Sequence, residues 1–420
     1  MEKKLFNFIE SSPTAFYAVE NACNMLREVG YTELFESNKW SLTDGGKYFV
    51  RRGGSSLIAF RYREGAKSLT IAASHSDFPA FKIKATPETS DSYNRLEVEK
   101  YGGPIHYSWL DRPLGVAGRV TVAVPCGVEN RLVKLDTLVT IPSLAIHLNR
   151  SVNESCSLNP AVDLLPLYST GREVGSFFEK VAQAAGVTAD ELLGADLFLY
   201  NAEGAYRIGA DGELFIAPRI DNLASVFAST VALCEAKESD SIPVLAVFDN
   251  EEVGSSTKQG AASSFLPDTL KRILGESLNT VLASSLMLSV DGAHAKHPNH
   301  PELSDRSNAP LLCGGVALKF NAQQRYTTDG ESAALVALLA ARAGVKLQRY
   351  HNRADLPGGS TLGAIASLGV SVPTADLGIP MLAMHSSVEC ASAQDFKMLT
   401  ALITELFSSS PQRNENGYSI

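Results

Sequence analysis

At both ends of the chain, the spacing of hydrophobic and polar positions predicts helices that alternate with strands. The middle of the chain lacks this alternation of helices and strands. Apolar side chains spaced three and four residues apart predict a helix between Ser12 and Gly30. The unbroken apolar run at residues 243–248 is typical of a strand that is covered on both faces. The same criteria predict strands at residues 55–62, 68–77, 284–291, 345–351 and 371–378, and helices at residues 222–238, 331–344 and 392–409.

The middle of the chain, residues 86–215, consists of short alternating segments that Gly, Pro and Asn separate. This pattern predicts an antiparallel β unit, with a helix over residues 173–196 and a hairpin that turns at Asp211–Gly212. We therefore expect an α/β domain, residues 1–85 and 216–420, that a β-rich insertion interrupts. The polar C-terminal tail is expected to be mobile.

Composition and charge narrow the classes of function. The net charge of −9 argues against a nucleic-acid or anionic-membrane partner, because either would require a basic surface. No apolar run reaches the roughly 18 residues of a membrane span. The six cysteines are scattered singly, which suits a reducing compartment, and the N-terminus lacks the pattern of a secretory signal. We expect a soluble cytoplasmic protein.

The stretch "IPVLAVFDNEEVGSST" places Asp249, Glu251 and Glu252 directly after a strand predicted to be buried. Two unit charges about 4 Å apart repel by about 4 kcal/mol at an effective dielectric constant of about 20. Either these carboxylates diverge into water or a positive charge compensates them. A divalent cation would provide that charge.

Other polar residues also close apolar segments. His75 and Asp291 end predicted strands, Asp221 precedes a helix, and His385 follows an apolar run. Ligands of open α/β sheets bind at the carboxyl ends of the strands. Imidazoles and carboxylates without a thiolate suit zinc, manganese or cobalt. Singly, each residue has an ordinary explanation, such as a helix cap at Asp221, so the prediction rests on their shared placement.

A second candidate metal site lies in the segment "DGAHAKHPNHPE". It carries His294, His297 and His300 within a few residues, a composition typical of metal-binding tracts. Pro298 and Pro301 interrupt any helix there, so the three imidazoles need not share a face.

Several sequence blocks, in order and spacing over nearly the whole chain, resemble the aspartyl aminopeptidase family of cocatalytic zinc exopeptidases. That resemblance implies a zinc-exopeptidase-like three-layer sandwich around a mixed β-sheet, with a β-rich inserted dimerisation domain. It also implies two divalent cations per subunit, zinc in the first place, with manganese or cobalt as alternatives. The blocks are "AASHSDFPAFKIK", "RIDNLAS", "FDNEEVGSST", "DGAHAKHPN", "LKFNAQQRYTTD" and "LGIPMLAMHSSVE".

The resemblance implies a role for each matching residue of the metal centre. His75 and Asp291 would bind one cation, and Glu252 and His385 the other. Asp221 would bridge both cations. Asp77 would orient His75, and Glu251 would act as the general base. Asp291 opens the histidine tract, so the resemblance also makes that tract the weaker candidate site.

The resemblance further implies how substrate is bound. Lys319 would face an acidic side chain, Tyr326 would help to stabilise the oxyanion, and His147 would reach the active site of a neighbouring subunit. The expected substrates are peptides with a free N-terminus and an N-terminal Asp or Glu. The expected assembly is a homo-oligomer, a tetrahedral dodecamer built from dimers.

Three alternatives stay open at this point. One is an aminopeptidase of the same family that prefers neutral or apolar N-terminal residues. Another is a related dinuclear deacylase or carboxypeptidase, which would require a cationic clamp for a substrate carboxylate. The third is a catalytically silent oligomeric scaffold, which would have no need of Glu251 or of a full set of ligands.

Overall fold

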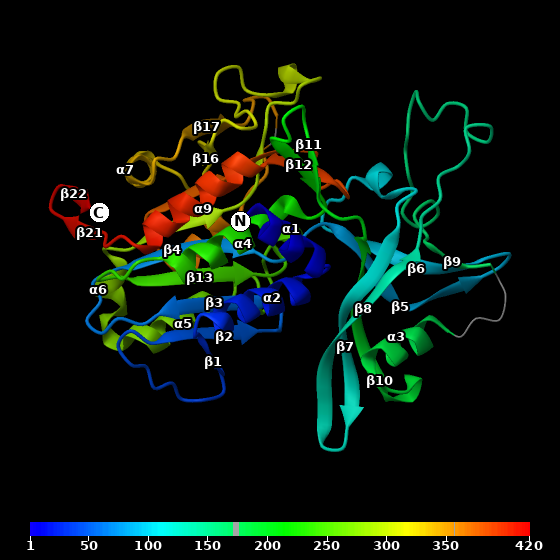
Figure 1. The fold of residues 1–420 in the computed structure, drawn as a ribbon, viewed down its shortest axis with the longest axis horizontal. Coiled ribbons are helices and arrows are strands. Elements are labelled where there is room, and N and C mark those ends of the chain that lie inside the picture. The colour runs from blue at the N-terminus through cyan, green and yellow to red at the C-terminus, as the bar shows by residue number, and fades with distance from the viewer. Residues whose placement is uncertain (171–175, 357) are drawn as a thin grey trace.

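The computed structural model describes residues 1–170, 176–356 and 358–420. A nine-stranded mixed sheet forms the centre of the larger part of the molecule (Figure 1). In spatial order its strands are β1 (Thr32–Leu34), β2 (Lys47–Arg52), β3 (Ser56–Arg61), β13 (Ile242–Phe248), β4 (Leu69–His75), β14 (Leu286–Val290), β18 (Thr374–Gly378), β16 (Val316–Phe320) and β17 (Leu347–His351).

Helices cover both faces of this sheet. Alternate residues of the central strands pack to opposite sides: Ala72 of β4 faces one core, and Ile71 and Ala73 face the other. Both faces are therefore buried, which explains the unbroken apolar sequence of the central strands. One face carries α1 (Glu2–Ser11), α2 (Ala15–Glu28), α4 (Ile220–Glu235), α7 (Gly330–Ala343) and α9 (Ala393–Phe407), and the other carries α5 (Phe265–Leu274), α6 (Leu278–Leu282) and α8 (Leu362–Gly369).

This arrangement confirms the predicted three-layer α/β sandwich around a mixed sheet. The central strands β13, β4 and β14 run parallel, whereas β3 and β16 pair antiparallel to their neighbours β13 and β18. Sequence patterns missed α1, which precedes the expected first helix. Across the described residues, none of the helices is long and apolar enough to span a membrane.

A separate six-stranded antiparallel sheet with its own hydrophobic core lies beside the sandwich (Figure 1). The antiparallel unit predicted from the alternating segments is thus present. The helix α3 (Phe177–Ala185) packs on this sheet. The strands in spatial order are β8 (Gly127–Val139), β7 (Leu114–Val124), β10 (Leu192–Asn201), β5 (Ala80–Ser90), β6 (Asn94–Tyr101) and β9 (Leu167–Ser169).

The helix predicted over residues 173–196 is wrong in its second half. Residues 173–175 lie outside the described residues, and α3 begins after the capping box of Ser176 and ends at Gly186, which adopts a left-handed conformation. Leu192–Asn201 is the strand β10, which pairs with β7 on one side and β5 on the other. Pairing along both edges outweighs the local helical pattern.

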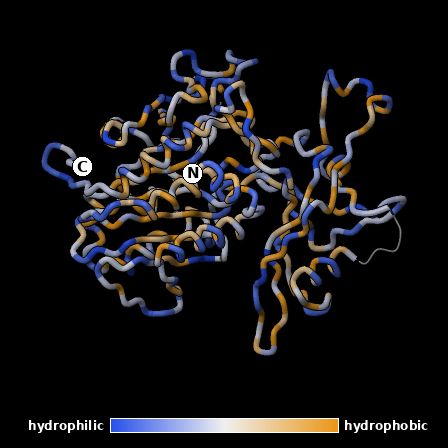
Figure 2. The backbone as a smooth tube through the Cα atoms, viewed as in Figure 1, coloured by the Kyte–Doolittle hydropathy of each residue, from blue (hydrophilic) through white to orange (hydrophobic). Residues whose placement is uncertain are grey.

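The remaining strands form a five-stranded sheet and a terminal hairpin. The predicted hairpin turning at Asp211–Gly212 is present, and its second strand pairs with β20, so it belongs to a different sheet from the rest of residues 86–215. The tail expected to be mobile instead forms a hairpin, hydrophilic in Figure 2. These strands are β11 (Tyr206–Ile208), β12 (Leu214–Ala217), β20 (Glu389–Ser392), β19 (Pro380–Leu382), β15 (Ala293–His294), β21 (Gln412–Asn414) and β22 (Gly417–Ser419).

Short 3-10 turns complete the framework. The turn that matters for the site is Glu251–Val253, directly after β13. Asn250 before it and Gly254 after it both have positive φ, so the chain reverses sharply there. The other 3-10 turns are His106–Trp109, Ala189–Glu191, Gly275–Ser277 and Pro301–Leu303.

Candidate active site

The strand-end residues predicted to converge lie at one edge of the large sheet. Strands β13, β4 and β14 are adjacent and parallel, and Phe248 pairs in register with His75. The chain leaves β13 towards Glu251 and leaves β14 at Asp291. Parallel strands bring their carboxyl ends together, so these side chains meet above the same edge.

Two imidazoles face carboxylates across short distances. The Nε2 atom of His75 lies 3.5 Å from Oδ1 of Asp221 and 3.4 Å from Oδ1 of Asp291. The Nε2 atom of His385 lies 3.6 Å from Oδ2 of Asp221 and 3.6 Å from Oε1 of Glu252. Each oxygen of Asp221 therefore faces a different imidazole, and Asp221 stands between the two halves of the cluster.

These separations fit ligands that surround cations better than they fit hydrogen bonds. A normal N–H···O bond spans about 2.7–3.2 Å. Two ligand atoms about 2.0–2.1 Å from a tetrahedral zinc lie about 3.3–3.4 Å apart. Oδ1 of Asp221 is buried and has no hydrogen-bond partner among the described residues. Ligand atoms of His75, Asp221 and Glu252 lie within 4.8 Å of one another, so this donor set fits divalent cations.

The electrostatics of the cluster favour added positive charge. Burial raises the pKa of Glu251 to about 7, and burial together with the charge of Asp221 raises that of Glu252 well above its usual range. Burial alone would lower the pKa of His385, but Asp221 and Glu252 raise it to about 10. Every one of these shifts reduces the net negative charge of the site, which is the effect that bound cations would have.

Asp77 contacts His75, which it was expected to orient, and also holds the backbone of Glu251 and Glu252, which the sequence did not indicate. His75 places Nδ1 at 3.0 Å from the backbone carbonyl of Asp77, and a proton on Nδ1 leaves Nε2 free to act as a ligand. The two oxygens of the Asp77 carboxylate accept the backbone N–H groups of Glu251 and Glu252, both at 3.1 Å. Tyr101 donates its hydroxyl to the same carboxylate at 2.7 Å. One carboxylate thus fixes the expected base and its neighbouring ligand.

Glu389 is a positioning residue that sequence reasoning missed. It is 2% exposed. Its carboxylate accepts the backbone N–H of Asp221 at 2.9 Å and that of His385 at 2.8 Å. Burial and the charge of Asp221 raise its pKa to about 8. The available signal was a glutamate within the alternating stretch "SVECAS", where a strand would bury it.

Lys319 and Tyr326 lie beside the cluster. Lys319 is 2% exposed, with Nζ 3.4 Å from Oδ2 of Asp291 and 5.3 Å from the ring centre of Tyr326. Burial raises the pKa of Tyr326 to about 12. A buried ammonium group thus adjoins one of the expected metal ligands.

The tract residue His294 lies near the cluster, because burial and the charge of Lys319 lower its pKa and Asp221, His385 and Asp291 also act on it. His297 and His300 are exposed. His147 is exposed in the loop after β8. In the tract, the rings of His297 and His300 are 5.4 Å apart, and His300 pairs with the exposed Glu302. Within the described residues, the group of ligand atoms close enough to hold a metal is at His75 and its neighbours, not in the tract.

Comparison with known proteins identifies the family. Residues 8–407 match the model of the family described as aminopeptidase I zinc metalloprotease (M18). The chain belongs to the M18 family of aminopeptidases. The resemblance found in the sequence is therefore confirmed at the level of the family, and this M18 chain is a metal-dependent aminopeptidase.

Relatives and solved structures agree with this assignment. A probable M18 family aminopeptidase 2 of Clostridium acetobutylicum is 40% identical, over 97% of this chain and 98% of its own. Its counterpart in Mycobacterium leprae is 37% identical, over 96% and 97%. The structure of Ape4 in complex with Nbr1 has a TM-score of 0.93 and 34% identity, over 96% of this M18 chain and 85% of Ape4. The dodecamer of S. cerevisiae mApe1 gives a TM-score of 0.84 and 28% identity, over 96% and 95%.

Proposed function

We propose that this M18 aminopeptidase removes N-terminal Asp or Glu from peptides with a free N-terminus, at a centre of two divalent cations. The observation that carries the proposal is the convergence of His75, Asp221 and His385, with one oxygen of Asp221 towards each imidazole. His75 and Asp291 would hold one cation, Glu252 and His385 the other, and Asp221 both. Cations in such a centre lower the pKa of a bound water and polarise the scissile carbonyl. The family description favours zinc.

Glu251 is the proposed general base. Its neighbour Glu252 belongs to the ligand set, whereas Glu251 lies near enough to His75 and Asp291 for their charges to shift its pKa. Its carboxylate takes the proton from the attacking water and then delivers it to the nitrogen of the leaving amine. Burial keeps the proton affinity of this carboxylate high, which suits the second transfer.

The acidic preference rests on Lys319. Its ammonium group is almost completely buried, and its ion-pair partner, Asp291, is itself an expected ligand. A substrate carboxylate would give this buried charge a second partner, which a Leu side chain does not provide. Tyr326, packed against Lys319, helps to stabilise the oxyanion. The carboxylates of the cluster attract the free α-ammonium group of the substrate.

We also propose that the chain works as a homo-oligomer, a tetrahedral dodecamer built from dimers through the inserted sheet. A dodecameric relative of the same fold supports this. The loop that carries His147 also exposes Leu144 at 61%, Ile146 at 47% and Leu148 at 76%, an apolar surface suited to burial against another subunit. His147 would then reach the neighbouring active site. A monomeric preparation with full activity would contradict this role.

The deciding experiment is hydrolysis of X-Ala-Ala peptides in which X is Asp, Glu, Leu, Lys or acetyl-Asp, with zinc, manganese or cobalt and with a chelated control. We expect Asp and Glu to be released fastest, and acetylation or chelation to stop the reaction. Preferential release of Leu would retain the mechanism and reject the acidic preference. If no peptide with a free amine is cleaved with any metal, the deacylase and scaffold alternatives return.

A further inference from the structure

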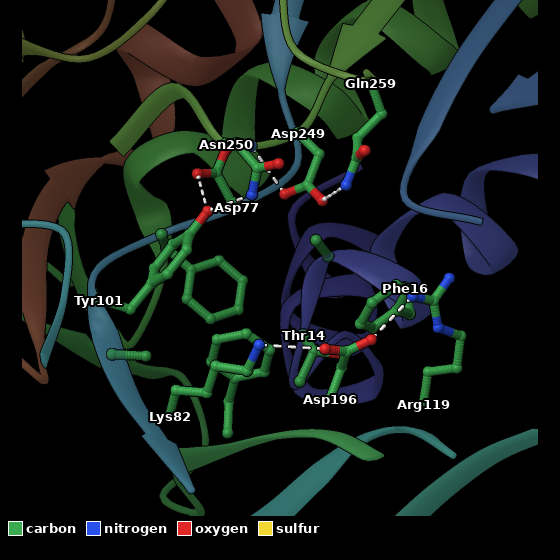
Figure 3. A pocket seen from close by; sticks show the side chains of 14 residues that line it. Thr14, Phe16, Asp77, Lys82, Tyr101, Arg119, Asp196, Asp249, Asn250 and Gln259 are labelled. Atoms are coloured by element: carbon green, nitrogen blue, oxygen red, sulfur yellow. Dashed lines mark hydrogen bonds and ion pairs between the residues drawn. The ribbon is translucent and has the colours of Figure 1, made fainter. Parts of the chain in front are cut away.

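A cavity of about 250 Å³ adjoins the candidate active site, at the junction between the two large sheets (Figure 3). Segments that are distant in sequence form its wall. Thr14 and Phe16 come from the start of α2, Lys82 comes from the inserted sheet, and Gln259 follows the turn after β13. The cavity shares Asp77 with the active site. Ligands often bind at such junctions, and the volume lies below the roughly 300–1,000 Å³ of sites for drug-sized molecules, so a smaller molecule fits.

The middle of the cavity is aromatic. Phe16, Phe78 and Phe198 line it, and the rings of Phe198 and Tyr101 meet edge to face at 5.4 Å. The guanidinium group of Arg119 lies 4.5 Å from the ring centre of Phe16. An apolar side chain would be buried between these rings.

One end of the cavity is cationic and contains two buried polar atoms without partners. Lys82 and Arg119 share the single carboxylate of Asp196, at 3.0 and 2.7 Å, which leaves one positive charge in excess (Figure 3). Among the described residues, buried Nε of Arg119 and buried Oγ1 of Thr14 have no hydrogen-bond partner. Thr14 is 3% exposed, and although it precedes α2, its side chain makes no capping bond. These groups suit a carboxylate.

The opposite end is anionic. Asp249 is 5% exposed, and the partners of its carboxylate are neutral: the hydroxyl of Ser55 at 2.6 Å, the amide of Gln259 at 3.3 Å and the N–H of Asn250 at 2.7 Å. The carboxylate of Asp77 lines the same end (Figure 3). The buried carboxylate of Asp249, whose partners are neutral, favours a cationic group such as an ammonium.

We propose that this cavity binds a free α-amino acid with an aromatic or large aliphatic side chain, its carboxylate towards Arg119 and Thr14 and its ammonium group towards Asp249. The two charged ends and the aromatic middle match the three parts of such a molecule. Free amino acids are the product class of any aminopeptidase, and the proposal does not depend on the acidic preference at the active site.

Occupancy of the cavity would act on turnover through Asp77. The carboxylate of Asp77 holds the backbone of Glu251 and Glu252, and an ammonium group at this end of the cavity would compete for the same oxygens. Among the described residues, none of the expected metal ligands lines the cavity. The bound amino acid therefore lowers kcat without competing for the peptide site.

Calorimetric titration of the metal-loaded enzyme with L-phenylalanine tests the site. N-acetyl-phenylalanine lacks the ammonium group, phenethylamine lacks the carboxylate, and L-aspartate lacks the apolar side chain. We expect each to bind about tenfold more weakly than phenylalanine, the loss typical of one charged hydrogen bond or an equivalent apolar contact. In steady-state assays, phenylalanine should lower kcat and leave KM for the peptide unchanged.

Two variants and one matched control complete the test. Thr14→Val and Lys82→Met should each weaken phenylalanine binding about tenfold. Lys84→Met removes a similar ion pair on the same strand, with Glu97, outside the cavity and should change nothing. Absence of binding, purely competitive inhibition, or equal binding to wild type and both cavity variants would overturn the proposal. If the peptide assays showed no preference for Asp or Glu, the expected binding of phenylalanine to the cavity would not change. The two proposals can therefore be rejected independently.

Discussion

Glu389 accepts a hydrogen bond from the backbone N–H of Asp221 at 2.9 Å, across 168 residues of sequence. The other oxygen of the same carboxylate accepts the backbone N–H of His385. One buried side chain thus sets the separation of the expected bridging ligand and an expected terminal ligand. Hydrogen bonds of this kind orient metal ligands without touching the metal.

Replacing Glu389 by Gln should loosen the centre without unfolding the protein. Glutamine keeps one acceptor oxygen and turns the other into a donor, so either Asp221 or His385 loses its backbone partner. We expect metal affinity and kcat to fall by about 10–100-fold, with kcat recovering in excess zinc. Zinc retention against a competing chelator measures this. Glu302→Gln, at an exposed carboxylate, is the control, and unchanged zinc retention in Glu389→Gln would reject the positioning role.

The adjacent carboxylates of Glu251 and Glu252 should respond differently to the same substitution. Glu251→Gln should keep its zinc and lower kcat by about 10²–10⁴-fold, because only the proton acceptor is lost. Glu252→Gln should lose zinc as well as activity, because a ligand is lost. Zinc content and kcat measured on the same preparations test both roles. Loss of zinc from Glu251→Gln, or activity left intact, would contradict its assignment as the base.

Lys319→Met should change selectivity more than overall activity. The substitution removes the buried ammonium group but keeps much of the side-chain volume, so the site loses its partner for an acidic side chain. We expect the ratio of kcat/KM for Asp-Ala-Ala over Leu-Ala-Ala to fall about tenfold or more. The control is Lys296→Met at an exposed lysine. Equal losses for the two peptides would show that Lys319 has no role in selectivity.

The ion pairs of Asp196 with Arg119 and Lys82 should make the stability of the protein depend on pH. Burial opposes the shift, but Arg119 and Lys82 hold the pKa of Asp196 below its ordinary value. The folded pKa is thus below the unfolded value of about 3.9, so the stabilisation is present above that pH and is lost as the pH falls through the folded pKa. Asp196→Asn should lower the unfolding midpoint at about pH 6. The difference in unfolding midpoint between Asp196→Asn and wild type should shrink towards about pH 3. A difference that grows on acidification would show that the ion pairs of Asp196 are not its cause.

The sequence predicted the elements that local patterns determine. His75 and Asp291 were placed correctly at strand ends because an unbroken apolar run marks a strand buried on both faces, and its end marks the ligand edge of the sheet. Residues 192–196 were assigned to a helix because only the pairing of Leu192–Asn201 with two distant strands makes this segment β.

Local sequence patterns could not predict the residues that hold the backbone of the site in place. Glu389 acts on backbone groups of residues far away in the sequence, and the carboxylate of Asp77 acts on Glu251 and Glu252 across the sheet edge. No spacing or periodicity encodes a contact of this kind, because it exists only after the strands have paired. A buried carboxylate in a strand is the single local sign of it.

The interruption of the sandwich has a consequence for the order in which the enzyme is made. Strand β4 ends at His75, and its neighbour β13 emerges only after the whole inserted sheet has been synthesised. The last expected ligand, His385, follows much later, and Glu389 later still. A ribosome-bound chain that stops short of these residues carries no complete peptidase centre. Peptidase activity therefore begins only after His385 and Glu389 have been synthesised.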